Sequence, residues 1–516
     1  MEGNPKMWMR YLQGRCGSKA IALSITFVLG GCAISPYPVD KQEIADVVQR
    51  DRDAARAGMP ALTAPLSLDE AIARALKFNL DHRTRILEQA LAIGQLDASR
   101  FDMLPRLVAN AGYTDRDEEN IRRATDSVTG EASLANPYIS SERRHTTSDM
   151  TFSWNILDFG ASYYAGKQQA DRVLIASERR RKSMHHLIQN VRTAFWRAIA
   201  AEKLQADIAV TIQEAETALA NSQRVEAERI KEPIEALRYQ RALLENLRLL
   251  ENVSRELTSA RVELAGLVGL TPSTQYTLLE PTEDQSKLTP LNTPVEQLEE
   301  MALTNNADLR EQFYNVRIAA HETRRALLKL LPGLSFDYGY NHDSDDYLIN
   351  NNWNEASMRV SFNLFNVFSA PSQLKSAKAE KTLAENRRMA LQMTVLTQLH
   401  LARQQYSDAL RHYQRADAIA QVDTRWMELT RNRQESQIDS QLDRVSVGVS
   451  AILSRLRRFE AIAKAQEAAG RMQATLGITP NIGSVDELTL PDLTRTMHEL
   501  LKSGVLAEQM APVPQM

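Results

Sequence analysis

The chain has 516 residues, which by length alone is enough for several domains. Its formal net charge is −3, so no positive excess indicates a nucleic-acid partner, and none is expected. The 20 glycines are few for this length, and a composition led by Ala, Leu, Gln, Arg and Glu favours long helices.

The N-terminus, residues 1–31, has the pattern of a signal peptide. A basic region precedes a short apolar stretch, 20–29. About ten apolar residues are too few to span a bilayer as a helix, so a cleaved export signal fits better than a membrane span. The stretch ends in Leu29-Gly30-Gly31-Cys32.

That ending resembles the bacterial lipobox. The resemblance implies that Cys32 becomes the acylated first residue of the mature chain, and Ala33 after it fits delivery to the outer membrane. The alternatives are an uncleaved anchor or a lone free cysteine. Because Cys16 would leave with the signal peptide, the mature chain would form no internal disulfide. An exported protein of this kind needs another source of stability, such as a large oligomeric interface.

Residues 32–65 are expected to be a loose, lipid-anchored leader, with prolines on both sides of a charged middle. Ser67 followed by Glu70 is a capping-box pattern and predicts the start of a helix. The helical pattern continues to Leu104, with a light break near Asn79, and Pro105 ends it.

A β-hairpin, 106–156, is predicted next. In 106–113 and again in 149–156, apolar side chains alternate with polar ones, which is the period of a strand with two different faces. A charged stretch, 115–144, joins the two strands. The apolar set is Leu107, Ala109, Ala111, Tyr113, Met150, Phe152, Trp154 and Ile156.

Long helices are predicted over 160–268. Residues 160 to about 230 contain no proline, which at ~1.5 Å per residue predicts a rod of roughly 100 Å. A second helix, from about 234 to 268, returns after a turn at 231–233.

The chain then repeats itself. Residues 68–113 and 295–340 align without a gap at an offset of 227, with 11 of 46 pairs identical, and residues 153–272 run parallel to 361–480 at an offset of 208. Two copies of one large unit narrow the possible folds severely. The predicted division is a signal peptide (1–31), a leader (32–65), a first repeat (66–272), a linker (273–294), a second repeat (295–480) and a C-terminal tail (481–516).

The second repeat uses the same elements as the first. A hairpin is predicted at 334–364 and long helices at 370–476, with a turn near 433–440. Six residues spaced by three or four form a coiled-coil-like seam in the first of these helices. They are Leu391, Val395, Leu399, Ala402, Tyr406 and Leu410.

Four strands of about eight to ten residues have the right length to cross an outer membrane. Open sheet edges cannot face lipid, and four strands cannot close a barrel alone, so strands from several copies must combine. Three chains would supply twelve strands, whereas two would supply eight, a barrel with room for little more than side chains. The alternative is an ordinary soluble sheet, against which the repeated helix–hairpin–long-helix order counts.

Together these motifs resemble the TolC-like outer-membrane efflux family, in its lipid-anchored branch, over roughly 66–480. The residues that carry the resemblance are Leu68-Asp69-Glu70-Ala71, Ala75-Leu76, Asn79, Leu104-Pro105, Tyr113, Ser153-Trp154-Asn155, Ser361-Phe362-Asn363 and Leu476-Gly477.

The resemblance implies a mainly helical fold with a membrane β-barrel part. It implies a homotrimer with a twelve-stranded barrel in the outer membrane and a helical barrel in the periplasm. Such a protein is a passive duct that a periplasmic adaptor joins to an inner-membrane pump; it needs no cofactor and catalyses nothing.

The family pattern also implies an acidic ring at the periplasmic tip. It falls on Asp443, with Asp439 one helical turn earlier and Glu235 at the equivalent place in the first repeat. The alternative is solvated carboxylates on a helix surface. Where family members hold the gate with a tyrosine and an arginine, this chain has Gln434 and Asp439. The nearby arginines, for which no partner can be assigned from the sequence, are Arg431, Arg433 and Arg444.

A second class of function is a lipid-anchored structural coiled-coil protein that only bridges membrane and periplasm. The four alternating strands separate the two readings, because a scaffold has no use for them.

Overall fold

The computed structural model describes residues 38–502. It excludes residues 57, 135, 229–232, 272–273, 283–287, 289, 435–440, 479–481, 483–484 and 486, and in addition the side chains of residues 56, 225, 233, 431–434 and 441–443. The chain divides into two units, Met1–Met59 and Pro60–Met516.

The first unit contains a helix where the sequence predicted a loose leader. Helix α2 (Lys41–Arg56) begins after Asp40, whose Oδ1 accepts a hydrogen bond from the Lys41 N–H at 2.7 Å. Cys32, the predicted lipidation site, lies outside the described residues.

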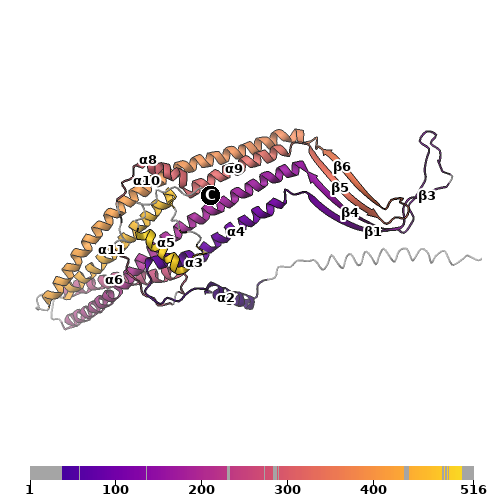
Figure 1. Cartoon of the computed structure of the whole chain (residues 1–516). Helices are drawn as coiled ribbons and strands as arrows, with labels where there is room; N and C mark the ends of the chain where they lie inside the picture. Colours follow the sequence, from indigo (N-terminus) through magenta and orange to yellow (C-terminus); the bar gives the residue numbers. More distant parts are fainter. Residues whose placement is uncertain are drawn as a thin grey trace, which may run out of the picture. The chain divides into compact units, whose positions relative to one another are not determined.

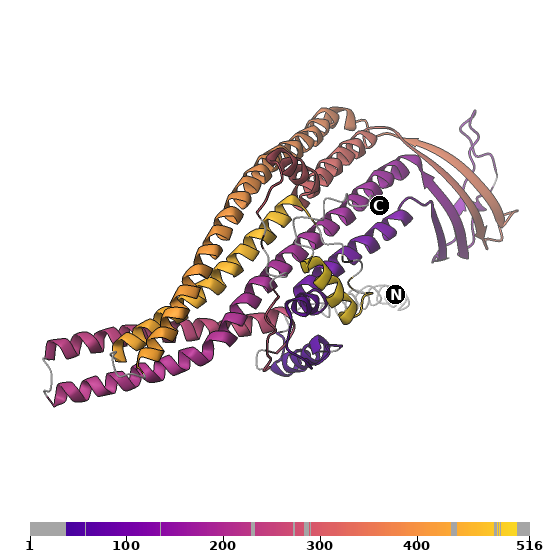
Figure 2. The ribbon, with the colours of Figure 1, turned by 60° about the vertical axis from the view of Figure 1, so that its left-hand side comes forward.

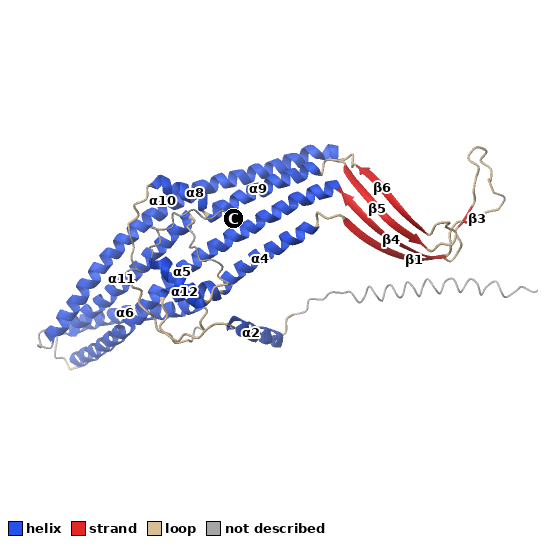
Figure 3. Ribbon diagram, viewed as in Figure 1, coloured by secondary structure: helices blue, strands red, loops and turns tan. Residues whose placement is uncertain are grey.

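The second unit combines long helices with one four-stranded sheet (Figure 1 and Figure 3). Its helices are α3 (Leu68–Phe78), α4 (Leu80–Phe101), α5 (Ile156–Ala227), α6 (Pro233–Leu267), α8 (Val295–Asn305), α9 (Ala307–Leu328), α10 (Asn366–Gln434), α11 (Gln441–Leu476) and α12 (Leu490–Lys502). Its strands are β1 (Arg106–Asp115), β2 (Ile121–Arg122), β3 (Tyr138–Ile139), β4 (Arg144–Asn155), β5 (Gly333–Asp343) and β6 (Asn352–Ser361).

The predicted duplication is confirmed by the element boundaries. Helices α8 and α9 and strand β5 each begin 227 residues after α3, α4 and β1, and α11 and β6 each begin 208 residues after α6 and β4. The repeats therefore have the same order of elements and nearly the same element lengths.

The local signals explain most helix starts. The Ser67 Oγ accepts a hydrogen bond from the Glu70 N–H at 3.2 Å, which caps α3 as predicted. The Asn155 Oδ1 accepts hydrogen bonds from the N–H groups of Leu157 and Asp158, so α5 begins at Ile156.

Several predicted boundaries are wrong. Ile156, predicted to end a strand, already has a helical backbone. The helix predicted to reach Leu104 ends at Phe101. In the second repeat, the hairpin predicted to end at residue 364 ends with β6 at Ser361, and α10 starts at Asn366 rather than 370. At Ile156 and Leu364 the polar–apolar alternation continues past the end of the strand, so the pattern predicts too long a strand. At the start of β6 polar residues occupy both faces, so the period is hard to read there.

The sheet and the helices share one lateral order. The strands pair in the order β1-β4-β5-β6, antiparallel throughout, and α4, α5, α9 and α10 pack side by side in the corresponding order (Figure 1 and Figure 2). Further along, the order becomes α6, α5, α11 and α10. The second unit is thus built from four parallel columns, with α6 following α4 and α11 following α9.

Two equivalent asparagines join the stacked helices. The Asn306 Oδ1 accepts the Leu309 N–H at 3.1 Å and so caps α9, while its Nδ2 donates to the Thr475 carbonyl at the end of α11 at 3.0 Å. Asn79 does the same between α4 and α6, through the His82 N–H and the Leu267 carbonyl. One asparagine side chain therefore hydrogen-bonds a free backbone N–H at the start of one helix and a free carbonyl at the end of another.

The main core lies where α3 and α12 pack on the long helices. It includes Phe195 and Ile199 of α5 and Leu493 and Met497 of α12. Helix α12 falls in the predicted tail and was not anticipated. The coiled-coil-like seam of α10 is confirmed at five of its six residues, since Val395, Leu399, Ala402, Tyr406 and Leu410 are buried and Leu391 is partly buried.

Gly477 is expected to be intolerant of any side chain. Its φ is +68°, and a Cβ there would lie 2.1 Å from the Asn305 carbonyl oxygen. We expect Gly477→Ala to lower the free energy of unfolding by about 3 kcal/mol or more, since the left-handed conformation and the clash add.

The matched control is Gly94→Ala, in α4. That glycine has open space around it, so alanine should stabilise the helix by about 0.5–1 kcal/mol. Denaturant melts of the purified protein measure both changes, and equal effects at the two positions would contradict the prediction.

Candidate functional site

One face of the four-stranded sheet is apolar and exposed. The register pairs Leu107 with Phe152 and Phe152 with Tyr338, so the apolar positions of successive strands fall on the same face. An exposed apolar area that spans a whole sheet indicates a surface that contacts a membrane or another protein. The large exposed side chains on it are Leu107, Tyr113, Met150, Phe152, Trp154, Phe336, Tyr338, Tyr340, Met358 and Val360.

The opposite face of the sheet is polar and internally hydrogen-bonded. The Asn110 Nδ2 donates to Asp149 at 3.0 Å, and the Ser153 hydroxyl donates to Asp337 at 2.5 Å. The hydroxyl of Ser357, on β6, also donates to Asp337 at 3.5 Å. The sheet therefore separates an apolar side from a hydrophilic side.

Both edges of this sheet are open among the described residues. Strand β1 pairs only with β4, and β6 pairs only with β5. The outer helices α6 and α10 likewise expose apolar side chains near their tips. These are Ile234, Leu237 and Leu244 on α6 and Ile419, Val422, Trp426 and Leu429 on α10.

Of the predicted gate residues, Glu235 and Asp443 have a described backbone, and they occupy equivalent positions in the two repeats. Glu235 is the third residue of α6, and its side chain is exposed. Asp443 is the third residue of α11, but its side chain lies outside the described part, as does Asp439 entirely. An acidic ring at the tip therefore stays a prediction.

Of the arginines considered for the latch, Arg444 has a partner that the sequence did not indicate. Its guanidinium forms an ion pair with the Glu214 carboxylate of α5, 230 residues away. The side chains of Arg431, Arg433 and Gln434 lie outside the described part.

No protein-family model matches the sequence, and no curated protein matches it. Solved structures match its fold. The Campylobacter jejuni CmeC outer membrane channel has a TM-score of 0.62 at 12% sequence identity, covering 85% of this chain and 89% of that one.

Two further matches agree with the first. The open state of the Neisseria gonorrhoeae MtrE outer membrane channel gives a TM-score of 0.58 at 16% identity, covering 80% of this chain and 88% of that one. The Vibrio cholerae outer membrane protein VceC gives 0.58 at 14% identity, covering 80% and 96%. The chain has the TolC-like outer-membrane channel fold.

In this channel fold, a polar seam of two buried carboxylates and two arginines that reach the surface joins the two repeats along α5 and α9. Asp171 is 3% exposed and accepts two hydrogen bonds from Arg317, the Nε one at 2.7 Å, and Glu178 pairs with Arg310 at 2.8 Å. Sequence reasoning missed this seam. The signal was present, because the two acids and the two arginines are each spaced by seven, which keeps them on one helix face.

A cavity of about 510 Å³ lies beside this seam, where α9 begins and α11 ends. Its lining includes Lys182, which pairs with Asp308 at 2.7 Å, and His185. The His185 Nε2 is buried without a hydrogen-bond partner in the described structure. Burial, and after it the positive charge of Arg181 and the neighbouring His186, lowers the pKa of His185 to about 4.

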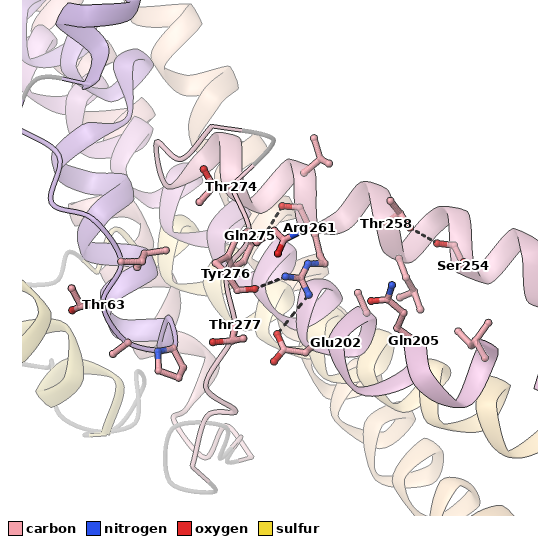
Figure 4. Close-up of a pocket in the computed structure, with 17 residues that line it drawn as sticks. Thr63, Glu202, Gln205, Ser254, Thr258, Arg261, Thr274, Gln275, Tyr276 and Thr277 are labelled. Atoms are coloured by element: carbon pink, nitrogen blue, oxygen red, sulfur yellow. Dashed lines mark hydrogen bonds and ion pairs between the residues drawn. The ribbon is translucent and has the colours of Figure 1, made fainter. Parts of the chain in front are cut away.

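A larger cavity, of about 810 Å³, lies between α5, α6 and the segments 62–65 and 274–277 (Figure 4). The Arg261 guanidinium lies over the Tyr276 ring and 3.7 Å from Glu202, and the Tyr276 hydroxyl donates to the Arg261 carbonyl at 2.7 Å. Burial raises the pKa of Tyr276 to about 12, so the phenol stays a donor. Glu202 also accepts the Leu278 N–H, so this network holds the linker against the long helices.

The described part of the chain contains no cluster of three or more His, Cys, Asp or Glu side chains that could hold a metal ion. No helix there combines the length and the apolar character that crossing a bilayer requires.

His185 should make the fold sensitive to acid. Because its folded pKa lies below its usual 6.5, the unfolded chain takes up the proton first, and stability is lost as the pH falls from about 6.5 towards 4. Between pH 7 and pH 5 this loss should be about 2 kcal/mol per chain. His185→Gln cannot titrate, so denaturant melts at the two pH values should show a change smaller by that amount. The same pH dependence in variant and wild type would exclude His185 as the cause.

Proposed function

We propose that this chain is the outer-membrane channel of a tripartite export system, a passive duct for substrates that an inner-membrane pump drives and a periplasmic adaptor delivers. The observation that carries the proposal is the exposed apolar face of a sheet whose other face is polar. In a membrane barrel the apolar face of such a sheet contacts lipid and the polar face contacts the water of the lumen.

The open edges require more than one copy. An unpaired backbone N–H or C=O in hydrocarbon costs several kcal/mol, so β1 of one copy must pair with β6 of the next. Three copies supply twelve strands, which leave an aqueous lumen, whereas eight strands enclose little beyond side chains. A homotrimer is therefore the proposed assembly.

The helical columns support the same closure. In a ring of copies, α6 of one chain would meet α10 of the next, and both carry exposed apolar side chains near their tips. Leu237 and Trp426 are among them. Burying both rows would remove apolar area from water, which stabilises the periplasmic part of the duct.

We further propose that the tips form the gate and that Cys32 carries the lipid anchor. The ion pair between Arg444 and Glu214 ties the first turn of α11 to α5 and would resist outward movement of the tip. Threefold symmetry would turn Asp443 into a ring that attracts cations, with Asp439 and Glu235 as weaker candidates.

A lipid-anchored periplasmic scaffold explains less. A scaffold would have to keep the apolar sheet face in water or cover it with another protein, and it needs no polar face opposite. The solved structures of similar fold carry channel names rather than enzyme names, which agrees with a duct that has no catalytic role and no cofactor.

The two sheet faces should respond differently to a charge. Met358 and Ser357 are neighbours on β6, both exposed, on the apolar and polar face respectively. Met358→Arg should cost roughly 2–4 kcal/mol per chain in the membrane, while Ser357→Arg, beside Asp337, should be tolerated.

The measurements are recovery of protein in the outer-membrane fraction, gel mobility with and without heating, and conductance in planar bilayers. Wild type and Ser357→Arg should give a heat-sensitive oligomer that conducts. Equal tolerance of both arginines, or a folded trimer that never conducts under any gating condition, would count against the duct.

Asp443 should control cations at the tip. Removing three carboxylates from a narrow ring should weaken block by divalent cations by about tenfold in Asp443→Ala. Glu235→Ala, at the equivalent position of the first repeat, is the matched control and should change the block less. Single-channel recordings with Mg²⁺ on the periplasmic side measure both, and unchanged block in Asp443→Ala would remove this residue from the gate.

A further inference from the structure

Two buried hydrogen-bond donors lie one turn apart on helix α5. Arg192 and Trp196 are each only 4% exposed. Residues four apart on a helix lie on the same face, so the two side chains leave α5 in the same direction. Trp196 belongs to the core that α3 and α12 form with the long helices, so both groups lie in the interior of the second unit.

Neither donor has an acceptor among the described residues. The Arg192 Nε and the Trp196 Nε1 are buried without a hydrogen-bond partner in the part of the chain that the structure describes. Desolvation by burial lowers the pKa of the Arg192 guanidinium to about 10. That value is still well above neutrality, so Arg192 is a buried positive charge.

Arg74 is as deeply buried, at 2% exposed, but it has a counter-charge. It pairs with Glu70 at 2.7 Å and donates to the Pro60 carbonyl at 3.0 Å. The partly buried Arg181 also has one, since it pairs with Glu178 at 2.6 Å. An unpaired buried charge is strongly unfavourable, so we expect Arg192 to have a counter-charge that is not among the described side chains.

We propose that Arg192 and Trp196 are the donors of a binding site for a small oxyanion of the sulfate or phosphate class. A guanidinium presents two parallel N–H groups that match two oxygens of such an ion, and the indole N–H supplies a third hydrogen bond. Because Arg192 and Trp196 are both only 4% exposed, a lipid or a peptide is too large to reach them, so the proposed ligand is a small ion.

An alternative counter-charge for Arg192 is a carboxylate of helix α11. Gly470 of α11 faces Gln189 of α5, because a Cβ added to this glycine would lie 3.7 Å from the glutamine side chain. Glu467 is three residues from Gly470 on α11, and Arg192 is three residues from Gln189 on α5. Glu467 is engaged by Arg471 of its own helix at 2.5 Å. The experiment therefore includes Glu467 as a control.

The site is tested with the full chain in detergent, first exchanged into chloride buffer. Sodium sulfate and sodium phosphate are titrated at constant ionic strength while tryptophan fluorescence and the melting temperature are recorded. The wild type should show a saturable response to the oxyanions, because Trp196, one of five tryptophans, contacts the ion. An oxyanion that survives exchange should appear by ion chromatography of the denatured protein, near one per chain.

Variants separate the site from general salt effects. Arg192→Met should abolish the saturable response. Arg192→Lys keeps the positive charge but lacks the two parallel N–H groups of a guanidinium, so it should weaken binding about tenfold. Trp196→Phe should lose the fluorescence change but keep a weaker stabilisation. Glu467→Gln should bind as the wild type does.

Three outcomes would overturn the proposal. One is a wild type that neither responds to the oxyanions nor retains one. Another is an identical response in Arg192→Met, or in Arg192→Lys if the former does not fold. The third is a Glu467→Gln variant that gains oxyanion binding absent from the wild type, since Glu467 would then be the counter-charge. These outcomes do not depend on whether the chain conducts.

Discussion

The need to pair every backbone N–H and C=O group in the sheet governs the rest of this structure. Strands β1 and β6 each leave one edge unpaired among the described residues, and one sheet face is apolar and exposed. In water the apolar face is unfavourable, and in lipid the open edges are. Both problems have one solution, a closed ring of strands from several copies, and the long helices then have to close around the same axis.

The duplication makes such a ring regular. Each repeat supplies one hairpin and one helical column pair, and the strands and helices keep the same lateral order. Asn79 and Asn306 connect the stacked helices in the two repeats with the same pair of hydrogen bonds. The repeats differ in the longer 115–144 connection of the first and in the Arg444–Glu214 pair, which the second makes to the first.

The interior of the second unit is stabilised in two different ways. Around α3 and α12 the contacts are apolar and include Phe195 and Leu493. Between α5 and α9 they are ionic, as in the Asp171–Arg317 pair. Asp171 is buried while Arg317 is half exposed, so removing the arginine would leave a buried carboxylate without its counter-charge. Such a seam therefore specifies the alignment of the two repeats more than it adds stability. Arg192 is the buried charge that neither arrangement satisfies.

How much of the fold was predictable follows from how local each signal is. The alternation of apolar and polar side chains from Leu107 to Tyr113 depends only on neighbouring residues, as does the seam from Val395 to Leu410. The existence of the strands, the long helices and the seam was therefore predicted correctly. The start of β4 was misplaced because it is polar on both faces. Helix α12 was missed because the segment was taken as a tail, although the spacing of Leu493, Met497 and Leu501 by four residues is a helical signal.

The sequence by itself determined the repeat, the period of each element and the two-faced strands, because side-chain alternation and helix spacing are properties of adjacent residues. Only the tertiary structure decided which distant groups meet. It brought Arg444 to Glu214 and Arg317 to Asp171, and it left Arg192 and Trp196 buried together without an acceptor among the described residues. Such pairings depend on how helices more than a hundred residues apart are aligned, and that alignment is set by packing across the whole unit.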